Sequence, residues 1–304
     1  MFKGLHSEFK DRISRLTGSE AGLLMESCVN PPRQSIRVNT LKTSVKACLK
    51  ALEPGFTLER VPWCGTGFYM EGDGLSSTLE YFLGHYYIQD AASMIPPEAL
   101  KPRPGELALD LTASPGGKTT HMAALMGNRG LLVANEGNHR RIGALRFNLS
   151  KYGILNAVVT GIDARESIEA GMLFDKILLD APCSGEGMFG VSRESVMQWS
   201  AGKIRRNSMT QKKIMENTVR LLAEGGALVY STCTYAPEEN EAVVDTAIDL
   251  GLTVEEFRLD GLETRPGIVE WEGKVFDESV SKCVRVYPFI NESIGFFTAK
   301  MVKK

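Results

Sequence analysis

The sequence lacks a long apolar run, a paired cysteine motif and a strong net charge. No stretch approaches the roughly 18 to 20 consecutive apolar residues of a membrane-spanning helix, and the opening MFKGLHSEFKDR contains no apolar signal core. The six cysteines form no Cys-x-x-Cys pair, which argues against a zinc site and a disulfide framework. We therefore expect a soluble, cytoplasmic protein with neither a bound metal ion nor a membrane partner.

The net charge of −2 conceals a gradient along the chain. Residues 1–50 carry nine Lys or Arg against four Asp or Glu, a local charge of +5, whereas residues 236–280 carry three against thirteen, a local charge of −10. Binding of a polyanion is therefore possible locally, although the total charge does not favour it. With 43% hydrophobic and 24% charged residues, the chain suits a globular protein with one large core and a smaller one.

A change of pattern near residue 100 divides the chain into two parts. Residues 1–100 mix short helix and strand signals, which predict a small α+β module with strands at 35–38, 56–61 and 67–70 and a helix at 44–51. Over residues 101–304, apolar runs alternate with amphipathic segments, which is typical of βαβ units around a parallel sheet. We predict a doubly wound α/β domain there.

The predicted elements of this domain are five parallel strands, three helices and a tail. The strands are at 107–113, 131–135, 157–162, 176–179 and 227–231. The helices are at 118–126, 139–152 and 203–223, each closed by a glycine. The tail has apolar runs at 254–259 and 295–302, for which we predict an antiparallel hairpin with no helix between its strands.

A glycine-rich turn, DLTASPGGKTT at 110–120, follows the first strong strand and opens a helix. Gly116 and Gly117 have no Cβ, so backbone N–H groups can approach a ligand closely, and the helix N-terminus adds positive potential. Two alternatives remain: a nucleotide-triphosphatase P-loop, which would need glycine where this chain has Thr112, and a plain strand-to-helix turn.

Acidic residues end four successive strands, which favours a cofactor site, since cofactors of open α/β sheets lie across the carboxyl ends of neighbouring strands. Asp110 and Asp180 end the first and fourth strands. Glu136 falls 26 residues after Asp110, near the separation at which a carboxylate takes both hydroxyls of a ribose, and Asp163 is placed to reach an adenine amino group. Singly, each is more often a helix cap.

Two cysteines, Cys183 and Cys233, follow the fourth and fifth strands and face the predicted cofactor. A thiolate there is a candidate nucleophile, and a nearby cation such as Lys118 would lower its pKa. A thiolate that adds to C6 of a pyrimidine makes C5 nucleophilic enough to accept a methyl group from a sulfonium. The remaining four cysteines are predicted to be inert core residues; they are Cys28, Cys48, Cys64 and Cys283.

Four segments, taken together, form a specific pattern: YYIQDAASM at 86–94, SPGGK at 114–118, DAPCSGEGMF at 180–189, and STCT at 231–234 followed by PEENE at 237–241. Jointly they resemble the RNA 5-methylcytosine methyltransferases of the RsmB, RsmF and NSUN (Nop/Sun) family, over nearly the whole chain. The chain departs from the usual family pattern at Thr112, Ser114, Glu136 and Phe289, and at Gly190-Val191-Ser192, which precedes Arg193.

The resemblance implies a Rossmann-like class I methyltransferase domain, with a seven-stranded, mostly parallel sheet and helices on both faces, preceded by the small RNA-binding module. It implies S-adenosyl-L-methionine as the cofactor, Cys233 as the nucleophile and Cys183 as the cysteine that assists release. Asp180 and Lys118 complete the expected catalytic set. The implied cofactor-binding residues are Thr112, Ala113, Ser114, Pro115, Gly116, Gly117, Lys118, Glu136, Asp163 and Asp180.

RNA is the expected partner of a monomeric enzyme, and the target cytosine must be single-stranded or flipped out of a helix. Trp199 is predicted either to stack on a base or to pack a long loop. Ribosomal RNA is the favoured substrate; the alternatives are transfer RNA, an inactive RNA-binding assembly factor, and a methyltransferase for proteins or small molecules. The expected RNA-binding residues are Arg37, Asn39, Lys42, Arg205 and Arg206.

Overall fold

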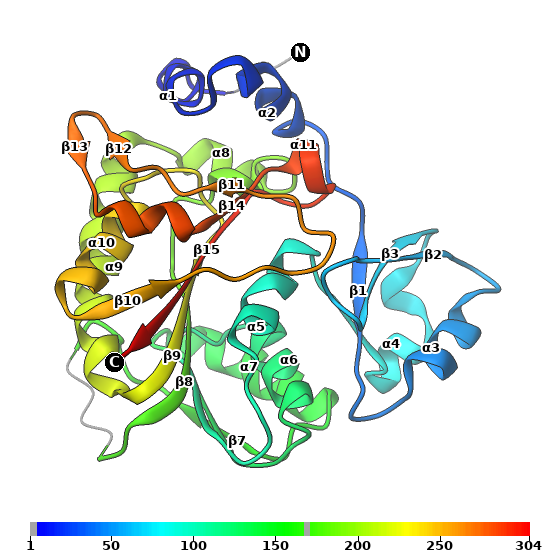
Figure 1. Ribbon diagram of the computed structural model, residues 1–304. Helices are drawn as coiled ribbons and strands as arrows, with labels where there is room; N and C mark the ends of the chain where they lie inside the picture. The colour runs from blue at the N-terminus through cyan, green and yellow to red at the C-terminus, as the bar shows by residue number, and fades with distance from the viewer. Residues whose placement is uncertain (1–4, 167–170) are drawn as a thin grey trace.

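The computed structural model describes residues 5–166 and 171–304. The first sheet has four antiparallel strands in the order β2-β3-β1-β4 (Figure 1). Helix α3 (Val45–Leu52) begins where the Ser44 hydroxyl accepts the N–H of Ala47, and its buried Cys48 and Leu52 pack on this sheet. The remaining elements are β1 (Ser35–Val38), β2 (Thr57–Arg60), β3 (Gly67–Glu71), β4 (Tyr86–Ile88) and α4 (Leu79–Leu83).

The first two helices, α1 (Ser7–Thr17) and α2 (Ala21–Ser27), lie away from this small sheet. Phe9 of α1 packs against the rings of Phe189 and Trp199, which belong to the second half of the chain. Figure 1 shows both helices above α8 and α11. Their packing therefore lies with the C-terminal part of the protein rather than with the β1–β4 module.

A larger mixed sheet carries the rest of the described chain. Its nine described strands run in the order β11-β14-β15-β9-β8-β5-β6-β7, with β10 paired to β15. The five strands from β9 to β7 are parallel to their neighbours, as predicted, whereas β10, β11, β14 and β15 pair antiparallel. The strands are β5 (Leu107–Asp110), β6 (Leu131–Asn135), β7 (Ala157–Thr160), β8 (Phe174–Asp180), β9 (Leu222–Thr232), β10 (Leu252–Glu255), β11 (Arg265–Pro266), β14 (Val284–Val286) and β15 (Phe296–Lys303).

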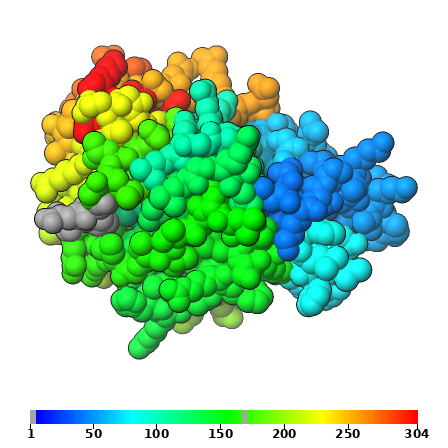
Figure 2. Space-filling view, turned by 90° about the horizontal axis from the view of Figure 1, so that it is seen from below, coloured from blue at the N-terminus to red at the C-terminus, as the bar shows by residue number. Residues whose placement is uncertain are grey.

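Helices cover both faces of this sheet, each through its own apolar residues. On one face α9 and α10 pack Ile214, Met215 and Val243 against the strands, and on the other α5, α6 and α7 supply Met122 and Leu145. The helices are α5 (Ile95–Leu100), α6 (Gly117–Leu125), α7 (His139–Lys151), α8 (Arg193–Gln198), α9 (Ala201–Leu221), α10 (Glu241–Asp249) and α11 (Pro288–Asn291); β12 (Glu270–Trp271) and β13 (Lys274–Val275) form a separate hairpin. Figure 2 shows the blue and cyan β1–β4 module packed against the green central part of the chain.

The structure differs from the sequence-based prediction at the edge of the large sheet, in the C-terminal tail and in several short elements that were not predicted. The sheet has nine described strands instead of seven, because the short strands β11 and β14 extend its antiparallel edge. The predicted terminal hairpin is wrong in its connection: β10 does pair antiparallel with β15, but α11 and β14 intervene along the chain. Helix α10 was not predicted. Within the described residues, no helix has both the length and the apolar character needed to cross a membrane.

Candidate active site

The thiols of Cys183 and Cys233 meet at the carboxyl edge of the large sheet. Strands β8 and β9 are parallel neighbours, with Asp180 opposite Ser231, so the loops that follow them emerge side by side. The two Sγ atoms are 3.2 Å apart, and both residues are half-buried. The hydrogen bond to Cys233, together with burial and the nearby Cys233 charge, raises the pKa of the Cys183 thiol well above its usual value. Cys183 therefore holds its proton and is placed to donate it to Cys233.

Lys118 and Asp180 form an ion pair beside the thiols. Lys118 Nζ lies 2.6 Å from Asp180 Oδ2, and the other carboxylate oxygen accepts a 2.8 Å hydrogen bond from the Ser231 hydroxyl. Burial alone would lower the pKa of the Lys118 ammonium, but the charges of Asp180, Asp110 and Cys233 outweigh it and the net pKa is raised. The ammonium therefore stays charged within the electrostatic reach of Cys233.

Two further acids, Asp90 and Asp110, line the same cavity as Lys118 and Asp180. Asp110 is 1% exposed and accepts a 2.6 Å hydrogen bond from the Thr119 hydroxyl; burial, with the Asp180 charge, raises its pKa to about 6. Asp90 follows β4 in the N-terminal module, and burial also raises its pKa to about 6. Sequence reasoning gave Asp90 no role, although its place after a strand within the recognised YYIQDAASM segment was a usable signal.

The turn at 112–118 lines a cavity of about 210 Å³ together with Tyr87, Asp90 and Asp180. Gly116 has φ of 110°, a conformation that side chains rarely adopt, so glycine is needed where the chain enters α6. Ser114 anchors the turn to α7: its hydroxyl donates to the Arg141 carbonyl, and its own carbonyl accepts from the Arg141 guanidinium. The Thr112 hydroxyl donates to the Asp180 carbonyl at 2.8 Å.

A second cavity, of about 640 Å³, lies on the other side of Thr112 and contains both remaining acids of the predicted cofactor site, Glu136 and Asp163. Glu136 is 5% exposed; its Oε1 accepts the N–H of Asn138, and its buried Oε2 forms an ion pair with the Arg141 guanidinium at 3.3 Å. A carboxylate beside this cavity fits a ligand that carries hydroxyl groups, as the ribose of S-adenosylmethionine does. Asp163 is paired with the exposed Arg165, whose hydrogen bonds lower the pKa of Asp163.

The structure corrects the placement expected for Arg37 and Asn39. Arg37 is 2% exposed, and its guanidinium donates to the Gln89 side chain, to the Gly117 carbonyl and to the Thr120 hydroxyl. Asn39 is also buried; its amide donates to two backbone carbonyls on either side of the interface between the module and the large domain. Since these polar groups are used inside the protein, neither side chain is available to RNA here.

The other expected RNA contacts lie on the surface. Lys42 is exposed, although its Nζ donates to the carbonyls of Leu83 and Lys151. Arg205 and Arg206 are exposed on α9. Trp199 is 3% exposed and its indole N–H donates to Glu186, so of its two predicted roles the structure supports packing rather than base stacking.

A cluster of metal-ligand residue types lies between the module and the large domain. Cys64, Glu98 and His121 offer ligand atoms within 4.8 Å of one another. They are joined by hydrogen bonds, from the Cys64 thiol to Glu98 at 3.3 Å and between the His121 ring and the same carboxylate oxygen at 3.1 Å. Burial and the nearby Arg37 cation lower the pKa of His121 to about 4. We interpret the cluster as a hydrogen-bonded link between the two parts.

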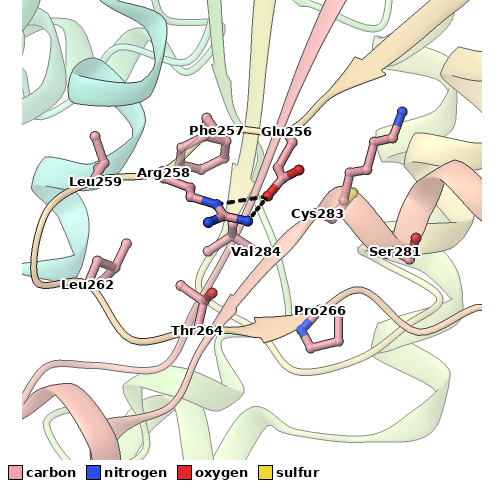
Figure 3. Close-up of a pocket in the computed structure, with 11 residues that line it drawn as sticks. Glu256, Phe257, Arg258, Leu259, Leu262, Thr264, Pro266, Ser281, Cys283 and Val284 are labelled. Atoms are coloured by element: carbon pink, nitrogen blue, oxygen red, sulfur yellow. Dashed lines mark hydrogen bonds and ion pairs between the residues drawn. The ribbon is translucent and has the colours of Figure 1, made fainter.

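A further cavity, of about 550 Å³, lies where the segment after β10 faces β14 (Figure 3). Figure 3 shows Arg258 paired with Glu256 of the same segment, and apolar side chains such as Phe257 and Leu262 that also line the cavity. It contains none of the predicted site residues, whereas all of the predicted cofactor-binding residues except Gly116 line one or both of the two cavities on either side of Thr112.

Comparison with known families finds two matches that together cover most of the chain. Residues 97–302 match the family model described as 16S rRNA methyltransferase RsmB/F. Residues 5–91 match the model described as the N-terminal domain of 16S rRNA methyltransferase RsmF. Both thiols and the residues that line the two cavities fall within the first of these matches, apart from Tyr87, Ile88, Gln89, Asp90 and Ser93.

Similar proteins have names from two branches of RNA modification. The tRNA (cytosine(49)-C(5))-methyltransferase of Pyrococcus abyssi is 39% identical over 99% of this chain and 97% of its own length. The ribosomal RNA small subunit methyltransferase F of Vibrio vulnificus is 40% identical over 98% of this chain, which spans 64% of that protein's length. A methyltransferase homolog from Pyrococcus horikoshii, solved by crystallography, is 37% identical with a TM-score of 0.89, over 99% of this chain and 96% of its own.

Proposed function

The chain belongs to the RsmB/F family of RNA methyltransferases, and from this premise we propose that it methylates C5 of a cytosine in RNA through a covalent bond between Cys233 and C6 of the base. The observation that carries this proposal is the 3.2 Å separation of two thiols at the strand ends where the cofactor cavities open. A paired-thiol site has no evident use in a methyltransferase for proteins or small molecules, or in an inactive assembly factor.

S-adenosylmethionine supplies the methyl group as an activated sulfonium. The chain's own contribution is to hold and orient this cofactor. The turn at 112–118 offers backbone N–H groups at the start of α6, and the Glu136 carboxylate is the proposed acceptor for ribose hydroxyls. Asp163 lines the same cavity as Glu136 and is the proposed contact to the adenine amino group.

Cys233 acts as the nucleophile and Cys183 as its proton partner. The Cys233 thiolate forms a bond to C6 of the cytosine, so that the electron pair of the C5–C6 double bond becomes available at C5 for the methyl group. After transfer, a base removes the C5 proton, the double bond re-forms and the bond between C6 and sulfur breaks. Cys183 retains its proton because Cys233 raises its pKa, and its S–H, 3.2 Å away, is placed to share that proton with the departing sulfur through a hydrogen bond.

Lys118 and Asp180 contribute electrostatically to the reaction of the Cys233 sulfur. The raised pKa of Lys118 keeps its ammonium charged, and this positive charge attracts the negative charge that the Cys233 sulfur carries as it leaves C6. Asp180 fixes the position of that ammonium at 2.6 Å and, on the wall of the smaller cavity, is the proposed contact to the base edge or to the methionyl end of the cofactor.

Ribosomal RNA is the substrate class that we propose first, because both parts of the chain match models described for 16S rRNA methyltransferases. Transfer RNA is the second candidate, favoured by the match along 97% of the P. abyssi tRNA methyltransferase. Lys42, Arg205 and Arg206 are the proposed RNA contacts, and their exposure supports this role.

The proposed function is tested with methyl-labelled S-adenosylmethionine and, separately, purified rRNA, tRNA and total protein. We expect label in RNA, a 5-methylcytosine at one position by bisulfite sequencing, and no transfer by Cys233→Ala, which should still bind the cofactor. Label in protein alone, or normal turnover by Cys233→Ala, would overturn the proposal. The bisulfite position decides between the two RNA classes.

A further inference from the structure

Glu239, six residues after Cys233, holds the loop that contains the other cysteine. It is 0% exposed, and the backbone N–H of Ser184 donates to its two oxygens at 3.0 and 3.2 Å, while the Ser184 hydroxyl bonds to one of them. Gln211 of α9 donates to Glu239 at 3.1 Å and to the Pro182 carbonyl at 2.8 Å. Glu239 therefore fixes the chain on both sides of Cys183.

Glu186 lies three residues after Cys183 and holds the loop that contains Cys233. It is 2% exposed, and its Oε2 accepts the Thr234 hydroxyl at 2.9 Å and the N–H of Tyr235 at 3.0 Å, the two residues that follow Cys233. Its Oε1 accepts the indole N–H of Trp199 at 2.8 Å. A carboxylate from the Cys183 segment therefore holds the Cys233 loop.

The hydrogen bonds of Glu239 and those of Glu186 belong to one network. The hydroxyl oxygens of Ser184 and Thr234 lie 2.7 Å apart, and Gly187 donates its N–H to the Cys233 carbonyl at 2.9 Å. A continuous row of polar side chains, Glu239–Ser184–Thr234–Glu186, thus runs directly behind the two thiols. Burying two carboxylates is unfavourable, and neutral groups would stabilise a loop at a lower energetic cost.

We propose that Glu186 and Glu239 are positioning residues for the methyl-transfer reaction, which form a reciprocal clamp that holds the Cys183 and Cys233 sulfurs at the separation needed for proton exchange. This inference rests on the proposed function. Neither residue touches a thiol; each acts through the residue next to the cysteine of the opposite loop. The clamp also gives a physical role to the PEENE and GEG segments, which the catalytic chemistry leaves unexplained.

The number of hydrogen atoms available to the row Glu239–Ser184–Thr234–Glu186 indicates that one of its carboxyl groups is protonated. The row contains three oxygen–oxygen contacts, whereas its two hydroxyls supply two hydrogens. A proton on one carboxyl group supplies the third, and burial raises the pKa of Glu239 to about 7. Glutamine at position 239 would keep one acceptor oxygen and offer an N–H in place of that proton, whereas alanine would remove both.

Four variants test the clamp: Glu239→Ala, Glu239→Gln, Ser184→Ala and, as a matched control, Glu238→Ala. Glu238 is the adjacent carboxylate, but its partner is Arg12 rather than a cysteine loop. We expect Glu239→Ala to lower kcat about 10- to 100-fold, with KM for S-adenosylmethionine within about twofold, because misplaced reacting groups lose rate rather than binding. Glu239→Gln should recover most of the loss, and Glu238→Ala should stay near wild type.

The second readout needs no RNA: the rate at which diamide joins Cys183 and Cys233 in a disulfide, followed by peptide mass spectrometry. Held at 3.2 Å, the thiols should react rapidly in the wild type and in Glu238→Ala, and at least about tenfold more slowly in Glu239→Ala and Ser184→Ala. Equal rates for Glu239→Ala and Glu238→Ala would overturn the clamp. If Glu239→Ala does not fold, Ser184→Ala replaces it in this test, and a wild-type rate of disulfide formation in Ser184→Ala would overturn the clamp. Failure of the proposed function would leave this rate unchanged.

Discussion

The sulfur atoms of Cys183 and Cys233 lie 3.2 Å apart, although 50 positions separate the two residues along the chain. The parallel pairing of β8 with β9 produces this contact, because it brings the carboxyl ends of both strands to one edge of the sheet. The same edge carries Lys118 and the two cavities. Two thiols and a cation therefore converge where the methyl donor is expected.

Arg37 is predicted to stabilise the protein rather than to bind RNA. Arg37→Met removes three hydrogen bonds at the interface between the module and the large domain, among them the buried one to the Gln89 side-chain oxygen. We expect the free energy of unfolding to fall by about 3 kcal/mol, the usual effect of breaking a buried polar network. Urea denaturation measures it, with Arg60→Met, at an exposed position of β2, as the control. Unchanged stability together with weakened RNA binding would restore the RNA-contact interpretation.

Glu136 is predicted to determine cofactor affinity. Glu136→Gln replaces a charged acceptor by a neutral amide at the wall of the larger cavity, so the ribose loses charge-assisted hydrogen bonds worth about 1.5 to 3 kcal/mol. We expect the Kd for S-adenosylmethionine, measured by titration calorimetry, to rise roughly 10- to 100-fold. The exposed Glu166→Gln should leave it unchanged, and equal Kd values for the two variants would exclude Glu136 from the cofactor site.

Asp110 is predicted to make stability depend on pH. Its folded pKa of about 6 lies above the roughly 3.9 of an unfolded aspartate, so its contribution is complete below that value and is lost as the pH rises through 6. Between pH 4 and 7.5 the wild type should lose about 2 to 3 kcal/mol more than Asp110→Asn, which does not titrate. Denaturant titrations across this range measure the difference, and parallel curves would contradict the assignment.

The elements were largely predictable because local pattern determines them. The strand limits 35–38 and 131–135 agree with β1 and β6, since apolar runs bounded by turn residues mark a buried strand directly. The order of the strands was less accessible. The insertion of β15 between β9 and β14 depends on contacts between residues far apart in the chain, which no local periodicity records.

The candidate site also has features that the sequence indicates and features that only the fold reveals. The meeting of Cys183 and Cys233 at one edge of the sheet could be expected from the sequence, because each lies shortly after the end of a predicted parallel strand. Arg37 was misplaced because a buried arginine and an exposed one look alike in a sequence, and only the fold shows which carbonyls the guanidinium meets. Glu186 and Glu239 act across 48 to 55 positions, on the opposite cysteine loop, so the sequence could mark their motif but not their partners.

The most direct test of the account is the identity of the protein atom that becomes bonded to RNA. Cys183→Ala is incubated with substrate RNA and S-adenosylmethionine, denatured and analysed for a protein–RNA adduct, whose attachment site is located by mass spectrometry. We predict an adduct at Cys233 that accumulates in Cys183→Ala and is absent from the Cys183→Ala/Cys233→Ala double variant. An adduct that persists in the double variant, or that maps to another residue, would contradict the account.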